Sequence, residues 1–121
     1  MNISENKQLP TSFIAVQTNI FTVVNILRPQ PEDQERVIEL LQKSMREMMV
    51  HQPGFISANI HKSLDSSHVL VYAQWDNAES LQQAAKLIEE GKAPSMMEVF
   101  SLGNAEYHPY EVVSVHKHVN Q

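Results

Sequence analysis

The chain contains no cysteine, only three glycines and a single tryptophan among its 121 residues. The absence of cysteine excludes disulfides, thiolate nucleophiles, zinc–thiolate sites and iron–sulfur clusters. A chain without disulfide-forming residues is typical of reducing compartments, so we expect a cytoplasmic location. Apolar runs are also short, and none approaches the ~20 residues that span a bilayer, so no membrane partner is expected.

Basic charge is scarce as well. Nine lysines and arginines stand against fourteen acidic residues, which gives a formal net charge of −5. A nucleic acid or an anionic membrane requires a basic patch that displaces counterions, so the composition argues against both. A hydrophobic content of 42% over this length suits one soluble domain. We expect a mobile arm over residues 1–12, whose polar start does not resemble a signal peptide, and a single domain over residues 13–121.

The central stretch of the chain has the pattern of an antiparallel hairpin. Two apolar, β-prone runs, residues 54–62 and 69–76, flank the turn cluster Asp65-Ser66-Ser67. A strand over residues 19–27 and a helix beginning at Pro31 precede the hairpin. A second helix, with Asp76 as its expected cap, and a last strand over residues 110–115 follow it. The resulting β-α-β-β-α-β order predicts an α+β fold, the ferredoxin-like split βαβ with an antiparallel sheet.

Both faces of the predicted hairpin carry apolar side chains. In its first strand, Ile56, Ala58 and Ile60 alternate with a row that includes Phe55 and His61. A sheet covered by helices on one side only normally shows polar residues on the other. The second face is therefore expected to be covered too, most simply by a second copy of the chain in a homodimer.

Three polar or aromatic residues of the strands are candidates for chemistry. Asn25 interrupts an otherwise apolar row, where it either satisfies a neighbouring backbone group or points a hydrogen-bond donor into a pocket. His61 is either a rim histidine bonded to a carbonyl or a base at a pocket mouth. Trp75 is either a large core residue or a stacking face for an aromatic ligand.

The helices indicate where a pocket lies. Met45, Met48 and Met49 recur at helical spacing, and their soft side chains suit either an adaptable core or a pocket around a flat ligand. The apolar stripe of the second helix is narrow and leaves space beneath it. Near the C-terminus, His116 and His118 would share one side of a strand, where they would either bind a metal or be solvated. We predict no metal site from this pair.

Three stretches resemble the antibiotic biosynthesis monooxygenase (ABM) family: residues 54–61 (GFISANIH), 72–81 (YAQWDNAESL) and 23–29 (VVNILRP). The resemblance covers about residues 19–90 and, more loosely, the final strand. It implies a dimeric α+β barrel in which two ferredoxin-like sheets pack face to face. It also implies a pocket in each subunit between the sheet and the helices.

Two branches of the family place different chemistry in that pocket. The pattern of the quinone-forming branch, which oxidises polycyclic phenols with dioxygen and no cofactor, is matched here by Trp75, His61 and Tyr72. The asparagine that this branch carries four residues before the tryptophan is Val71 in this chain. The haem-degrading branch resembles the chain at Asn25, but its tryptophan and ligating histidine would fall at Ala84 and Pro94.

The resemblance therefore predicts a monooxygenase that oxidises a small or polycyclic phenol or quinol-type aromatic with dioxygen and without metal or cofactor. A closed-shell aromatic anion can itself donate an electron to dioxygen, which removes the need for a cofactor. The alternative is a noncatalytic dimer that binds a small hydrophobic ligand or quinone, and haem degradation is the third hypothesis. The predicted catalytic residues are Trp75, His61 and Asn25. The predicted substrate-binding residues are Tyr72, Val71, Met45, Met49, Phe21 and Leu81.

Overall fold

A computed structural model describes residues 9–16 and 19–120. Four strands form one antiparallel sheet: β1 (Phe21–Pro29), β2 (Phe55–Lys62), β3 (Val69–Trp75) and β4 (Gly103–Tyr110). Their spatial order is β2-β3-β1-β4, so β2 and β4 are the two edge strands. This arrangement confirms the predicted α+β class and the antiparallel sheet.

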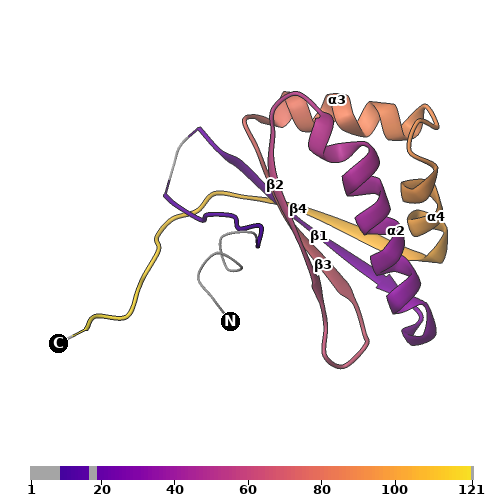
Figure 1. Ribbon diagram of the computed structural model, residues 1–121, viewed down its shortest axis with the longest axis horizontal. Coiled ribbons are helices and arrows are strands. Elements are labelled where there is room, and N and C mark those ends of the chain that lie inside the picture. The colour runs from indigo at the N-terminus through magenta and orange to yellow at the C-terminus, as the bar shows by residue number, and fades with distance from the viewer. Residues whose placement is uncertain (1–8, 17–18, 121) are drawn as a thin grey trace.

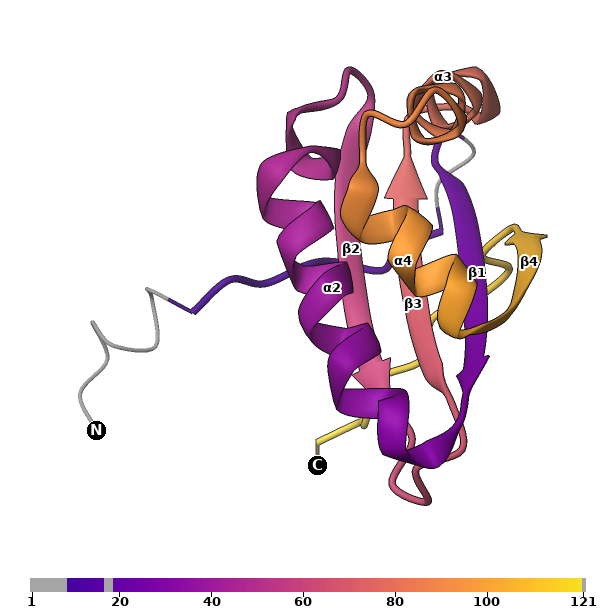
Figure 2. The ribbon, with the colours of Figure 1, turned by 90° about the vertical axis from the view of Figure 1, so that its right-hand side faces the viewer.

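The helices lie on one face of this sheet, and we call the opposite face the open face (Figure 1). They are α2 (Gln34–Glu47), α3 (Ala78–Glu89) and α4 (Pro94–Leu102), with short 3-10 turns at Pro31–Asp33 and Met49–His51. Figure 2 shows α2 and α4 running side by side across the sheet, with α3 at one end of it. Within the described residues, no helix combines the length and apolar character that a membrane crossing requires.

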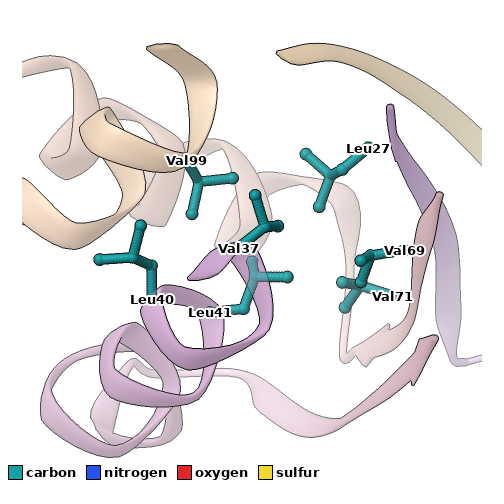
Figure 3. Close-up of a cluster of buried hydrophobic side chains, with 7 residues drawn as sticks. All are labelled: Leu27, Val37, Leu40, Leu41, Val69, Val71 and Val99. Atoms are coloured by element: carbon teal, nitrogen blue, oxygen red, sulfur yellow. The ribbon is translucent and has the colours of Figure 1, made fainter. Parts of the chain in front are cut away.

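Periodic apolar residues join α2 to the sheet. Val37, Leu40 and Leu41 follow the i, i+3, i+4 spacing of one helix face and are almost completely buried. Figure 3 shows Val37 and Leu41 on the side of Leu27, Val69 and Val71, and Leu40 on the side of Val99. All seven side chains belong to one buried cluster. Burial of each such side chain contributes roughly 1.5–3 kcal/mol, so this cluster anchors α2 and α4 over one end of the sheet.

The last strand lies earlier in the chain than the sequence pattern predicts. The β-branched run at residues 110–115 suggested a strand there, but β4 ends at Tyr110, and residues 111–120 form neither helix nor strand. The chain pairs with β1 directly after α4, because Gly103 has no side chain. A Cβ at Gly103 would lie 2.6 Å from the carbonyl oxygen of Arg28. Pro109 is tolerated inside β4 because this is an edge strand.

A β-bulge changes which residues of β2 face the helices. The register of β2 against β3 shifts between Phe55 and Ser57, so Ile56 is an extra residue in the strand. The prediction that Ile56 shares the face of Ala58 is therefore wrong. Phe55 takes that face instead, and its ring meets Trp75 edge-on with 5.3 Å between the centroids.

The cap of α3 also differs from the prediction by one residue. The Asn77 side chain, rather than that of Asp76, accepts a hydrogen bond from the backbone N–H of Ser80 at 2.8 Å. Asp76 instead uses its backbone N–H to bond the carbonyl oxygen of Gly54 at 2.8 Å. This bond joins the end of β3 to the start of β2, so Asp76 holds the two strands together at the end opposite the turn.

The predicted hairpin turn is present between β2 and β3. Asp65 accepts hydrogen bonds from the Ser67 hydroxyl at 2.7 Å and from the Ser67 backbone N–H at 3.0 Å. These bonds stabilise the carboxylate and lower the pKa of Asp65 to about 2. Gln34 at the start of α2 reaches the same loop and donates from Nε2 to the carbonyl oxygens of Ser63 and His68.

The N-terminal segment lies on the open face. Ser12 donates a hydrogen bond to the Asn59 side chain at 2.6 Å, and the Phe13 carbonyl accepts one from Gln74 at 3.0 Å. Residues 10–16 thus cover β2 and β3 without adding a strand to the sheet. Of the arm predicted over residues 1–12, residues 1–8 lie outside the described part.

Candidate functional site

An apolar cavity of about 510 Å³ lies between the sheet and the helices. Its size falls within the ~300–1,000 Å³ of typical small-molecule sites. Val23, Val71 and Ala73 of β1 and β3 form part of its floor. The opposite walls come from all three helices and the 3-10 turn at Met49–His51, whose lining residues include Met45, Met49, Leu81, Ala85, Ile88, Met96 and Phe100. The cavity therefore suits a flat apolar ligand.

The space beneath α3 follows from its sequence. Its stripe toward the sheet consists of Leu81, Ala84, Ala85 and Ile88, and the two alanines fill little volume. Ala84 is buried, whereas Ala85 is exposed at the cavity wall. The prediction of a narrow stripe with free space beneath the helix is confirmed.

Trp75 belongs to the residues that line the cavity. The side chain is 1% exposed to solvent and is held by the edge-on contact with Phe55. It also packs with Val23, Met49 and Ala73 in a second buried cluster. Trp75 is thus a core residue that also belongs to the cavity lining, and its stacking against an aromatic ligand stays a prediction.

Asn25 places an amide on the cavity floor. It lies opposite Val71 of β3 and opposite Tyr107 of β4, and all three residues line the cavity. The sheet side chains that bond to one another or to backbone, such as Ser57, Asn59 and Gln74, belong to the open face. The Asn25 amide therefore presents a donor and an acceptor to a largely apolar space, where a hydrogen bond is electrostatically stronger than in water.

The structure brings most of the predicted site residues together. Trp75 and Asn25, predicted to be catalytic, and Val71, Met45, Met49 and Leu81, predicted to bind substrate, all line the cavity. Phe21 packs against the buried cluster around Trp75, opposite it on β1, and is not a lining residue. His61 and Tyr72 lie on the open face, because they alternate with Ile60 and Val71 of the cavity side.

Several lining residues were missed from the sequence. Phe100 and Tyr107 line the cavity and are 44% and 53% exposed, so they lie where it opens to solvent, together with Gln82 of α3. Tyr107 was missed because the last strand was predicted too late in the chain. The pairing of β4 with β1 is a long-range contact that no local pattern reports.

The cavity lining includes one charged residue, Glu106, which precedes Tyr107 on β4. The Glu106 carboxylate accepts a hydrogen bond from Arg28 Nε at 2.9 Å and lies 3.2 Å from His108 Nε2. The hydrogen bond from Arg28, followed by the contact with His108, lowers the pKa of Glu106. The charge of Glu106 is thus paired with Arg28 and His108, and Asn25 contributes an uncharged amide to the sheet side of the cavity.

The described residues contain no group of three or more histidine, aspartate or glutamate side chains that is arranged to hold a metal ion. His116 and His118 lie in the tail after β4, where the strand expected to align them is absent. The His116 ring instead makes a 3.0 Å hydrogen bond with the Ser114 hydroxyl.

The sequence of the chain is similar to that of a known protein. The chain is 37% identical over 62 residues to the tetracenomycin-F1 monooxygenase of Streptomyces glaucescens, a match that covers 51% of this chain and 55% of that protein. The chain thus matches only about half the length of that relative.

Solved structures share the fold at lower identity. SnoaB from Streptomyces nogalater, a cofactor-independent oxygenase, superposes with a TM-score of 0.63 at 19% identity over 81% of this chain and 97% of its own. The ActVA-Orf6 monooxygenase of Streptomyces coelicolor, solved with the ligand nanaomycin D, gives 0.67 at 23% identity over 84% and 93%.

A sequence model of one family matches residues 20–87, which include β1, α2, β2, β3 and most of α3. This segment carries Asn25, Val71 and Trp75 of the cavity. The chain belongs to the antibiotic biosynthesis monooxygenase family.

Proposed function

We propose that this protein is a cofactor-independent monooxygenase that oxidises a phenol or quinol-type aromatic with dioxygen in the cavity between the sheet and the helices. The observation that carries this proposal is the composition of the cavity: a largely apolar space of about 510 Å³ whose lining includes the amide residue Asn25 and the aromatic residue Trp75. Tetracenomycin-F1 monooxygenase and SnoaB support the reaction class.

The chemistry needs few protein groups. An electron-rich aromatic anion transfers one electron to dioxygen, and the two radicals combine to a peroxide at a ring carbon that carries hydrogen. The peroxide takes up the proton that the substrate lost when it formed its anion. Loss of water from the resulting hydroperoxide converts the ring carbon to C=O, so one oxygen atom enters the substrate and the other leaves as water. The substrate supplies all of the electrons, and the protein has to bind the ring, favour its anion and exclude bulk water.

Asn25 and Trp75 have the positions that these tasks require. The Asn25 amide can donate a hydrogen bond to the substrate oxyanion, and the apolar walls strengthen that bond. Removal of one such donor typically lowers a turnover rate by about 10²–10³. Trp75 is 1% exposed, so it shapes the wall and helps to keep water out, while the ring packs mainly against the more exposed side chains of the cavity.

Val71 favours a second candidate function, a noncatalytic protein that binds a small hydrophobic ligand or quinone. Val71 lies beside Asn25 on the cavity floor and offers no hydrogen bond. In this alternative, the same cavity binds the ligand without oxidising it.

We further propose that two copies pair through their open faces. Val24, Ile26, Leu70 and Tyr72 are only half-buried there. Residues 9–16 and the tail 111–120 leave the sheet on this side (Figure 1) and carry further exposed apolar side chains. The exposed apolar residues of this face and these segments are Leu9, Phe13, Ile14, Val16, Ile56, Tyr110, Val113, Val115 and Val119. A self-complementary apolar surface of this kind favours a two-fold dimer, in which His61 and Tyr72 would lie at the interface.

Oxygen uptake by metal-stripped protein over a panel of anthrones and dihydroxynaphthalenes tests the proposed reaction. We expect saturable uptake above spontaneous oxidation and a loss of about 10²-fold or more in Asn25→Leu, which keeps the branched shape of the side chain but removes the amide. Asn104→Leu makes the same exchange at an exposed position of β4 and should retain full activity.

Oxygen uptake that is unchanged in Asn25→Leu would contradict the proposed role of the Asn25 amide in binding the substrate oxyanion. Uptake that is lost in His61→Ala would place the chemistry on the open face instead. Saturable binding of the same aromatics without any uptake would support the noncatalytic alternative.

A further inference from the structure

Tyr107 is the aromatic residue beside Asn25 in the cavity wall. Asn25 has one register partner on each side, Val71 in β3 and Tyr107 in β4. Val71 cannot form a hydrogen bond, whereas the tyrosine hydroxyl both donates and accepts. Side chains directly opposite in an antiparallel pair have Cβ atoms about 4.5–5.5 Å apart. The side chains of Asn25 and Tyr107 therefore leave the sheet next to each other.

The setting of Tyr107 suits a group that contacts a ligand from the cavity mouth. Its side chain is 53% exposed although it lines an apolar cavity, and Phe100 across the mouth is 44% exposed. β4 is an edge strand that pairs only with β1. Tyrosine has an apolar ring and a polar tip, so it can cover a ligand with the ring while the hydroxyl reaches a polar atom.

We propose that Tyr107 is a substrate-positioning residue, whose hydroxyl acts together with the Asn25 amide to hydrogen-bond the oxygen-bearing edge of the aromatic ligand. This inference rests on the proposed ligand site. Two hydrogen-bonding groups side by side on neighbouring strands hold one edge of a flat ring, whereas a single group would leave the ring free to turn. A fixed orientation brings the reacting carbon to one place in the cavity, which favours reaction.

The chain offers a direct probe of ligand binding. Trp75 is its single tryptophan and lines the cavity, so a quinone bound there should quench the tryptophan fluorescence. The chain has no cysteine, so 1,4-naphthoquinone has no thiol to alkylate. Naphthalene has the same two rings without oxygen, and its affinity can be measured by displacement of the quinone.

The experiment compares 1,4-naphthoquinone and naphthalene in the wild type, in Tyr107→Phe and in Tyr110→Phe. Tyr110 is the matched control, because it lies on the same strand and is 54% exposed but pairs with Thr22 of the open face. We expect Tyr107→Phe to raise the dissociation constant of the quinone about three- to tenfold, as the loss of one neutral hydrogen bond predicts. Naphthalene affinity should stay unchanged in this variant, and Tyr110→Phe should bind both probes as the wild type does.

Two results would overturn the assignment of Tyr107 while leaving the ligand site intact. Tyr107→Phe could bind the quinone as tightly as the wild type, or it could weaken both probes equally, which would indicate a purely steric wall. A wild-type protein without saturable quenching would instead overturn the ligand site itself, and the role of Tyr107 with it.

Discussion

At the scale of single residues, Asn25 is a polar group among the largely apolar residues that line the cavity. An amide that is half-buried among apolar side chains lowers the stability of a fold when its desolvation is not offset by a hydrogen bond. The hydrogen-bonded amides of this sheet, Asn59 and Gln74, lie on the other face. Two roles for Asn25 were open from the sequence, and the structure places its side chain among the residues that line the cavity.

Gly54 is a second residue whose identity has a specific physical reason. Its φ angle is +83°, in the region that residues with a side chain rarely adopt, and a Cβ there would collide with the side chains of Asp76 and Ser80. Gly91 has nearly the same angle, φ +81°, but open space where its Cβ would be. An alanine at Gly91 would therefore cause backbone strain alone, whereas an alanine at Gly54 would cause both backbone strain and a steric collision.

We predict that Gly91→Ala lowers the free energy of unfolding by about 1–2 kcal/mol through the backbone term. Gly54→Ala should lower it by a further ~1–3 kcal/mol, because the turn before β2 must also shift to relieve the collision. Urea denaturation of the two variants measures the difference. Equal losses would mean that Asp76 and Ser80 move aside without cost.

At the scale of elements, Gln34 links the start of α2 to the β2–β3 loop. Its side chain is 4% exposed, and Nε2 lies 3.1 Å from the Ser63 carbonyl oxygen, 3.3 Å from the Ser63 hydroxyl and 3.0 Å from the His68 carbonyl oxygen. The amide donors thus satisfy backbone groups of the loop. A helix and a hairpin far apart in the sequence are held in one arrangement by this contact.

We predict that Gln34→Glu lowers the free energy of unfolding at neutral pH by about 1–3 kcal/mol, because a carboxylate faces two carbonyl oxygens without a proton to donate. Gln42→Glu is the control, since it makes the same exchange at an exposed position of α2. It should change stability by no more than about 0.5 kcal/mol. Similar losses in both variants would show that the loop contact contributes nothing.

At the scale of the whole molecule, the sheet has one face packed against helices and one that is covered only in part. The N-terminal segment contacts β2 and β3 on the open face. Leu70 and Ile26 of the same face remain half-buried in the single chain. This imbalance between the two faces is the physical basis of the proposed dimer.

We predict that the wild-type protein sediments as a dimer of the 13.8 kDa chain and that Leu70→Glu sediments as a monomer. Each copy would then bury a carboxylate in the interface, which is unfavourable without a partner. Leu64→Glu provides the control, because Leu64 is 96% exposed in the β2–β3 loop, away from the open face. A monomeric wild type, or dissociation of Leu64→Glu as well, would contradict pairing through this face.

Local sequence patterns were sufficient to locate most elements and their order. Apolar periodicity of 3.6 and of 2 depends only on neighbouring residues, so it located α2, α3 and the β2–β3 hairpin and indicated an antiparallel α+β fold. The types and positions of Trp75, Met45 and Met49 also made them possible pocket residues, whereas Val71 was a candidate only through the resemblance to the family.

Packing between distant segments determines which apolar faces of the helices and strands contact one another. The bulge at Ile56 moved Phe55 onto Trp75, and the pairing of β4 with β1 brought Tyr107 beside Asn25. His61 and Tyr72 alternate along their strands with Ile60 and Val71. Because the helices cover the face of Ile60 and Val71, His61 and Tyr72 lie on the face away from the cavity. A shift of one residue in register exchanges the two faces of a strand, and register depends on the partner strand as well as on the strand itself. Local patterns alone therefore cannot determine it.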